Sequence, residues 1–189
     1  SAIMNYAVKY YGLRYNPCYA AGGMGKSRAE EMSIWTRDQF EQFIKMEKRP
    51  GYRCAFNTLF YTGIRCGELL ALTPGDIERD TPVIHINKTF ATIKGEDVIL
   101  TPKTPKSRRD VTIHHQLHEE LLEYIDGMCL SQDERIFYFK KSGLRACFQR
   151  LAKKAGLEVI RIHDLRHSHA SMLIEMGVPR SEERRVGKE

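Results

Sequence analysis

The sequence predicts a mixed α+β fold that is mainly α-helical, with a small three-stranded antiparallel sheet near residues 82–114. Apolar residues recur at helical spacing before residue 72 and after residue 117, which is the pattern of helices that bury one face. Between these regions lie short runs of β-branched residues bounded by turn residues. The 189 residues, 42% of them hydrophobic, suffice for one packed domain with an appendage.

The first residues indicate the end of a helix. Apolar side chains recur at helical spacing over residues 1–15, and the Asn16-Pro17 pair would end that helix. Residues 21–33 are mostly small, polar or basic, as in a flexible linker. We therefore expect a second domain to begin near Ser33.

Three helices are predicted before the β region. Thr36 is a candidate N-cap for the first, because Gln39 stands three residues later and could form the reciprocal bond of a capping box. The second helix is expected over residues 52–61 and ends at Gly63, since glycine adopts the backbone angles that a helix end needs. A short third helix covers residues 66–72.

The middle of the chain is predicted to form strands at residues 83–86, 98–100 and 110–113. Residues 94–97 can make the turn between the first two. Residues 102–109 contain two prolines, which disfavour a continuous strand, and several basic side chains. This segment is expected to be a basic hairpin tip.

The last part of the chain returns to helical periodicity. Helices are expected around residues 117–125 and 144–151, and from His163 to Gly177. Residues 180–189 have one apolar side chain and no helical stripe. Such a tail is not expected to join the core.

The bulk composition limits the class of protein. A formal net charge of +6 favours a polyanionic partner without specifying one. The five cysteines include no C-x-x-C pair, which is typical of reduced thiols in the cytosol. There is no signal-peptide pattern and no run approaching the ~18 apolar residues that span a bilayer. We expect a cytoplasmic protein that does not enter a membrane.

Two arginine motifs stand far apart in the sequence. The first, T-G-I-R-C-G-E-L, contains Arg65 and Glu68, and the second, H-D-L-R-H, contains His163 and Arg166. The planar fork of arginine suits phosphate, and histidine exchanges protons near neutral pH. Glu68 could brace the guanidinium of Arg65. Taken singly, each residue is more often a paired surface charge or a basic helix start, so the case depends on the combination.

The two motifs give the chain a resemblance to a known family. The pattern T-G-x-R-x-x-E-L, a basic hairpin lysine and then H-D-L-R-H is similar to the catalytic domain of tyrosine recombinases, which include phage and conjugative-transposon integrases. The likeness covers residues 34–179. Residues 1–20 resemble the last helix of the family's core-binding domain, with residues 21–33 as linker and 180–189 as an atypical tail.

The resemblance implies site-specific DNA recombination, the integration or excision of a mobile element such as a transposon, with double-stranded DNA as partner. Members work as multimers and need no metal or other cofactor. Arg65 and Arg166 would bind the non-bridging phosphate oxygens, and His163 would help to move a proton. Lys103 would protonate the leaving 5′-oxygen, and Glu68 would be a structural support. The expected DNA contacts on the hairpin are Lys106, Arg108 and Arg109, with Lys106 also the alternative general acid.

One feature departs from the family pattern. The family's nucleophile is a tyrosine that follows the second arginine motif, whereas all nine tyrosines here precede Arg166. We therefore expect the catalytic domain to be incomplete, with no nucleophile in the chain and no covalent DNA adduct. Whether the chain itself is an enzyme is left open by the sequence.

Three other interpretations remain. His163 and His167 are four residues apart and imitate a zinc helix, although a third ligand is missing and Arg166 would repel a cation. The same basic surface could bind DNA without reacting, or the chain could be a fragment with apolar surface uncovered around Leu173 and Ile174.

Overall fold

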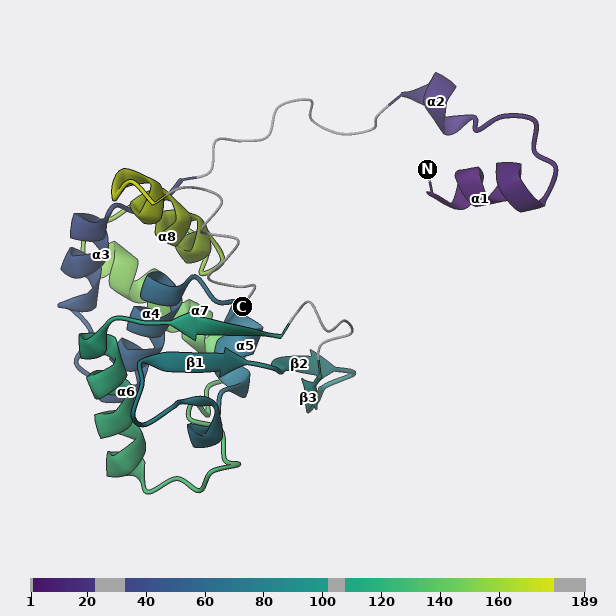
Figure 1. The fold of residues 1–189 in the computed structure, drawn as a ribbon. Coiled ribbons are helices and arrows are strands. Elements are labelled where there is room, and N and C mark those ends of the chain that lie inside the picture. The colour runs from purple at the N-terminus through teal and green to yellow at the C-terminus, as the bar shows by residue number, and fades with distance from the viewer. Residues whose placement is uncertain (1, 23–32, 102–107, 179–189) are drawn as a thin grey trace. The chain divides into compact units, whose positions relative to one another are not determined.

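The computed structural model of the chain describes residues 2–22, 33–101 and 108–178 (Figure 1). The chain divides into two compact units, Ser1–Met32 and Ser33–Glu189. The first unit contains α1 (Ala2–Tyr10) and the single turn α2 (Cys18–Ala21). The α1 helix buries none of its residues, so its apolar side chains do not form a core of their own.

The second unit is mainly helical and is arranged around one central helix. The described helices are α3 (Arg37–Ile44), α4 (Pro50–Thr62), α5 (Cys66–Ala71), the short 3-10 helix η1 (Pro74–Asp76), α6 (His115–Met128), α7 (Lys141–Lys154) and α8 (Asp164–Glu175). The α4 helix packs against α3, α5, α6 and α8 (Figure 1). Eight of its thirteen residues are buried, which is the burial expected of a helix surrounded by others.

The two helix signals expected from the sequence are confirmed. The Thr36 hydroxyl accepts the Gln39 backbone N–H (3.3 Å), and the Gln39 side chain accepts the Thr36 N–H (2.9 Å). This reciprocal capping box starts α3. At the other signal, Gly63 ends α4 in the left-handed region, with φ of 60°.

The β structure differs from the expected three-stranded sheet, because the four described strands form two separate antiparallel pairs. The β1 strand (Val83–Ile86) pairs with β4 (Arg109–Thr112), and β2 (Thr89–Ile93) pairs with β3 (Glu96–Leu100). The β2 strand was not predicted from the sequence. It takes β3 as its partner through a two-residue turn, Lys94-Gly95, in which both residues have positive φ. The fold class, mainly α with small antiparallel sheets, is nevertheless confirmed.

Aromatic side chains fill the core of the second unit. Six phenylalanines are fully buried: Phe40, Phe43, Phe56, Phe60, Phe137 and Phe148. Phe40 of α3 stacks on Phe60 of α4 with ring centroids 3.9 Å apart. Trp35 stacks on Phe148 of α7 at 5.0 Å. Each large ring removes much apolar surface from water, so these contacts hold α3, α4 and α7 in one body.

Candidate DNA phosphate site

Arg65 stands at the N-cap of α5, and Glu68 fixes both its main chain and its side chain. Its backbone N–H donates to Glu68 Oε2 (2.8 Å), and its Nη1 donates to Glu68 Oε1 (2.9 Å). The Glu68 side chain is 8% exposed, whereas that of Arg65 is 58% exposed. The buried carboxylate thus anchors an arginine whose guanidinium stays accessible, as the sequence suggested for this pair.

A second arginine shares the same carboxylate. Arg109, the first residue of β4, donates from Nη1 to Glu68 Oε1 (3.1 Å) and from Nη2 to Oε2 (2.7 Å). Burial alone would raise the pKa of Glu68, but the bonds from Arg109 and from the Arg65 backbone outweigh it and lower that pKa. Glu68 is therefore ionised between two guanidinium groups.

Arg166 connects the second motif to the first. Its Nη1 donates to the backbone carbonyl oxygen of Gly63 (2.5 Å), and Gly63 stands two residues before Arg65. Arg166 lies on α8, one of the helices packed on α4. Tertiary packing thus brings together two motifs that are about one hundred residues apart.

His163 and Arg65 line the same pocket, of about 510 Å³, which we call the Arg65 pocket. His163 immediately precedes α8 and is exposed. The pocket is also lined by Cys66 and by polar or basic side chains of α7 and the segment before α8: Lys141, Arg145, Gln149 and Arg161. Arg166 and Arg109 line a neighbouring pocket of about 560 Å³ together with Gly63 and His167.

The basic side chains of α7 were missed in the sequence. Lys141 and Arg145 are four residues apart and so lie on one face of the helix. The apolar stripe of α7 predicts a helix but does not point to its polar side as part of a site. A basic row opposite an apolar stripe is a usable signal, but it does not reveal which surface the row faces.

The structure describes only some of the basic residues that the sequence predicts on the hairpin. Lys103 and Lys106 lie outside the described residues, as do residues 180–189. Arg108 is exposed. Arg109 was expected at a basic tip, but it is a strand residue whose side chain is 16% exposed and paired with Glu68. Its expected DNA contact stays a prediction.

The zinc interpretation has one geometric test. The rings of His163 and His167 are 5.5 Å apart and perpendicular. Within residues 2–22, 33–101 and 108–178, no three His, Cys, Asp or Glu side chains gather as metal ligands. Asp164, between the two histidines, is instead bound by the backbone N–H (2.9 Å) and guanidinium of Arg161.

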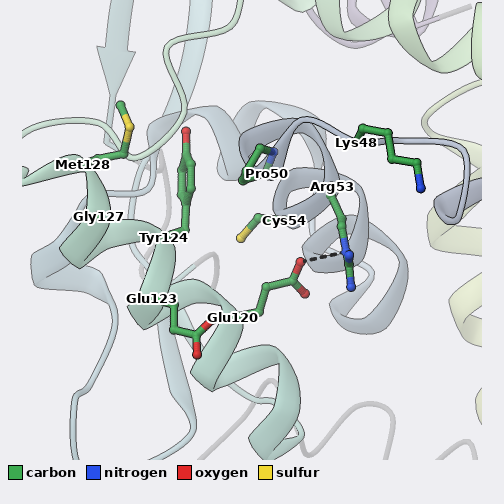
Figure 2. A pocket seen from close by; sticks show the side chains of 9 residues that line it. All are labelled: Lys48, Pro50, Arg53, Cys54, Glu120, Glu123, Tyr124, Gly127 and Met128. Atoms are coloured by element: carbon green, nitrogen blue, oxygen red, sulfur yellow. Dashed lines mark ion pairs between the residues drawn. The ribbon is translucent and has the colours of Figure 1, made fainter.

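A further pocket, of about 530 Å³, lies between α4 and α6 and contains none of the residues singled out in the sequence (Figure 2). Arg53 forms an ion pair with Glu120 across it (3.5 Å), and Cys54 lines it. Burial raises the pKa of the Cys54 thiol, so this thiol is neutral and weakly reactive. The pocket offers charges of both signs and no convergent set of donors.

The fold is that of solved tyrosine recombinases. The structure of the Tn1549 transposon integrase in complex with a circular intermediate DNA matches with a TM-score of 0.79 at 19% identity, covering 100% of this chain and 68% of that one. The crystal structure of XerA recombinase matches with a TM-score of 0.66 at 20% identity, covering 86% of this chain and 57% of that one. These likenesses concern the fold alone.

The sequence comparison defines the family. The phage integrase family model matches residues 34–182, and the chain belongs to this family of tyrosine recombinases. It is 33% identical over 194 residues to the ICEBs1 integrase of Bacillus subtilis (strain 168). The aligned region covers 94% of this chain and 52% of that protein. The chain spans about half the length of the curated relatives it matches. None of the helices in the described part of the chain has the length and apolar character needed to cross a membrane.

Proposed function

We propose that residues 34–179 are the DNA-binding and phosphoryl-transfer part of a site-specific recombinase that integrates or excises a mobile element. The observation that supports this most directly is the meeting of the two motifs. Arg166 bonds to Gly63, two residues before Arg65, and His163 lines the same pocket as Arg65. We infer from these two observations that the two arginines and the histidine would act on one DNA phosphate.

The chemistry follows from the charges of these side chains. A phosphodiester gains negative charge on its non-bridging oxygens during in-line attack, and arginines held beforehand stabilise that charge. His163 would accept or donate a proton near neutral pH. Lys103, or Lys106 in its place, would protonate the departing 5′-oxygen. Neither metal nor cofactor enters this proposal.

Relatives support DNA as the partner. The Tn1549 transposon integrase has been solved with transposon right end DNA and with circular intermediate DNA. We extend that partner to this chain and place the DNA backbone over the Arg65 pocket, where Lys141 and Arg145 would contact flanking phosphates. Residues 1–20 would then be the last helix of a core-binding domain. We also propose that the complete protein acts in the cytoplasm as a homo-multimer on DNA.

The nucleophile in this reaction class is a tyrosine. Every tyrosine of the chain precedes Arg166, and the last is Tyr138, whose side chain lies beside Arg135. We therefore propose that the chain by itself binds DNA and forms no 3′-phosphotyrosyl adduct. This second function, DNA binding without strand cleavage, is favoured by the tyrosine positions alone.

The experiment separates binding from reaction. Binding of a fluorescent DNA duplex is measured by anisotropy for the unaltered chain, Arg65→Ala, Arg166→Ala and the control Arg79→Ala, whose guanidinium pairs with Asp126 (2.7 Å). We expect the first two substitutions to weaken binding and the control to leave it unchanged. Equal binding by all four proteins would refute the phosphate site.

The reaction is tested with a pool of nicked duplexes of randomised sequence, which trap covalent intermediates. Denaturing gels should show no protein–DNA adduct for this chain. An adduct would show that a tyrosine before Arg166 is the nucleophile and would overturn the non-cleaving part of the proposal.

A further inference from the structure

We propose that Arg109 is a positioning residue that keeps Arg65 available to DNA by neutralising Glu68, and does not itself contact DNA. This inference rests on the proposed function, since it concerns the arginine assigned there to the phosphate. It changes the role expected for Arg109, which the sequence suggested as a DNA contact on the hairpin.

Arg65 and Arg109 share the carboxylate of Glu68. Glu68 Oε1 accepts from Nη1 of Arg65 and from Nη1 of Arg109, and Oε2 accepts from the backbone N–H of Arg65 and from Nη2 of Arg109. Arg109 therefore binds both oxygens through its planar fork, whereas the Arg65 side chain uses a single nitrogen in its bond to Glu68. The fork is the geometry in which arginine binds a carboxylate most strongly.

The two arginine side chains differ in their exposure to solvent. The Arg109 side chain is 16% exposed and that of Arg65 is 58% exposed. A DNA phosphate approaching from solvent meets Arg65, while Arg109 lies against the buried carboxylate. Strand pairing also fixes the backbone position of Arg109, since Arg109 lies opposite Ile86 of β1 in the antiparallel pair. The next pair on the ladder, His85 and Asp110, adds a side-chain bond of 2.7 Å.

Arg109 also changes the net charge around Glu68. One carboxylate between two guanidinium groups leaves a net positive charge for an incoming phosphate. Without Arg109, Arg65 and Glu68 would form a neutral pair, and a phosphate would have to compete with Glu68 for the Arg65 guanidinium. Opposite charges interact strongly at hydrogen-bonding distance when one of them is shielded from water. The lowered pKa of Glu68 is consistent with this, because the carboxylate stays charged.

The first test asks whether Arg109 acts through Arg65. Binding of a fluorescent duplex is measured for Arg65→Ala, Arg109→Ala and the double variant, with the fold checked by circular dichroism. We expect Arg109→Ala to weaken binding roughly tenfold alone and less than about twofold when Arg65 is already alanine. The matched control is Arg108→Ala, an exposed neighbour, whose effect should be the same in both backgrounds.

The second test asks whether the effect passes through the charge of Glu68. In the double variant Arg109→Ala/Glu68→Gln the carboxylate is replaced by a neutral group of the same shape. We expect binding to recover to within about threefold of the unaltered chain. Loss of a residue that only supports the fold, or of one that contacts DNA, would not be rescued by neutralising the carboxylate that it binds.

The outcomes distinguish a failure of the proposed function from a failure of the positioning role of Arg109. If the chain fails to bind DNA, or if Arg65→Ala has no effect, the proposed function fails. If Arg65→Ala weakens binding but Arg109→Ala acts equally in both backgrounds, or is not rescued by Glu68→Gln, only the positioning role fails. Where Arg109→Ala does not fold, Arg109→Gln takes its place in both tests, because glutamine keeps a long polar side chain but removes the positive charge that neutralises Glu68.

Discussion

Arg166 and Gly63 are joined by a hydrogen bond of 2.5 Å from the guanidinium Nη1 to the backbone carbonyl oxygen, although they are 103 residues apart. Gly63 ends α4, and α5 begins three residues later with Arg65 as its cap. The backbone turn at Gly63 therefore sets the position of Arg65 and also receives Arg166. The two arginines of the proposed phosphate site depend on the conformation of one glycine.

Substituting Gly63 with alanine should destabilise the chain and weaken DNA binding together. The residue has a φ of 60°, where a side chain costs about 1–2 kcal/mol. An added Cβ would also lie 2.7 Å from Cδ2 of His169, so the His169 ring on α8 would have to move. Chemical denaturation should show a loss of stability of at least that size, and anisotropy should show weaker binding.

The control for this substitution is Gly127→Ala. Gly127 lies in α6, has no positive φ, and an added Cβ there would meet no atom within 4 Å. Alanine favours helix over glycine by roughly 0.5–1 kcal/mol, so this variant should be slightly more stable and bind DNA normally. Equal stability of the two variants would contradict the role given to the Gly63 turn.

Local signals in the sequence predicted much of the fold. The Thr36–Gln39 capping box and the Gly63 helix end involve residues close in sequence, so composition and spacing determine them. The sheet was predicted less well because strand pairing is non-local. Thr89–Ile93 alternates only weakly and buries a single residue, Phe90, so its pairing with β3 became visible only in the structure.

The candidate site also contains residues that local motifs predict and contacts that only the structure shows. Arg65, Glu68, His163 and Arg166 stand in short motifs and were named from the sequence. The bond between Arg109 and Glu68 depends on the register of β4 against β1, which no local pattern reveals. The spacing of Lys141 and Arg145 in the sequence predicts that they share one face of α7. Only the packing of α7 against α5 shows that this face lines the Arg65 pocket.

Glu47 should make the free energy of unfolding of the chain fall at acid pH. Its side chain is 3% exposed, and burial acts to raise its pKa, but bonds from Arg49 and from the Cys147 thiol lower it from 4.5 to about 2. A carboxylate with a lowered folded pKa stabilises the protein above pH 4.5, and this contribution is lost as pH falls toward 2. The contribution at neutral pH is about 3 kcal/mol, from ~1.4 kcal/mol per pKa unit.

Glu47→Gln should therefore lower the free energy of unfolding at pH 7 and flatten its dependence on pH below 4.5. Urea denaturation at a series of pH values measures both effects. Glu41→Gln serves as the control, since Glu41 makes an exposed ion pair with Arg37 (3.0 Å), worth less than ~1 kcal/mol. A pH profile that Glu47→Gln leaves unchanged would argue against the ion pair with Arg49.

DNA bound over the Arg65 pocket should protect Cys66 from alkylation. Cys66 lines this pocket, and burial raises the pKa of its thiol, so its reaction with iodoacetamide is slow even without DNA. Saturating duplex should slow it severalfold further. Cys129 is exposed and serves as the internal control in the same sample. Mass spectrometry of the labelled peptides measures both rates, and equal DNA effects on the two thiols would contradict the proposed position of the DNA.

The basic row of α7 should contribute to binding through its charge. Lys141 and Arg145 line the Arg65 pocket, so each would neutralise one phosphate and release the counterions condensed on it. The plot of log K against log salt should therefore lose about one unit of slope for Lys141→Ala or Arg145→Ala and about two for the double variant. Arg79→Ala should keep the full slope, because that side chain pairs with Asp126. If the α7 variants weaken binding equally at all salt concentrations, they act through the fold. If they leave binding unchanged, the DNA backbone does not follow this helix.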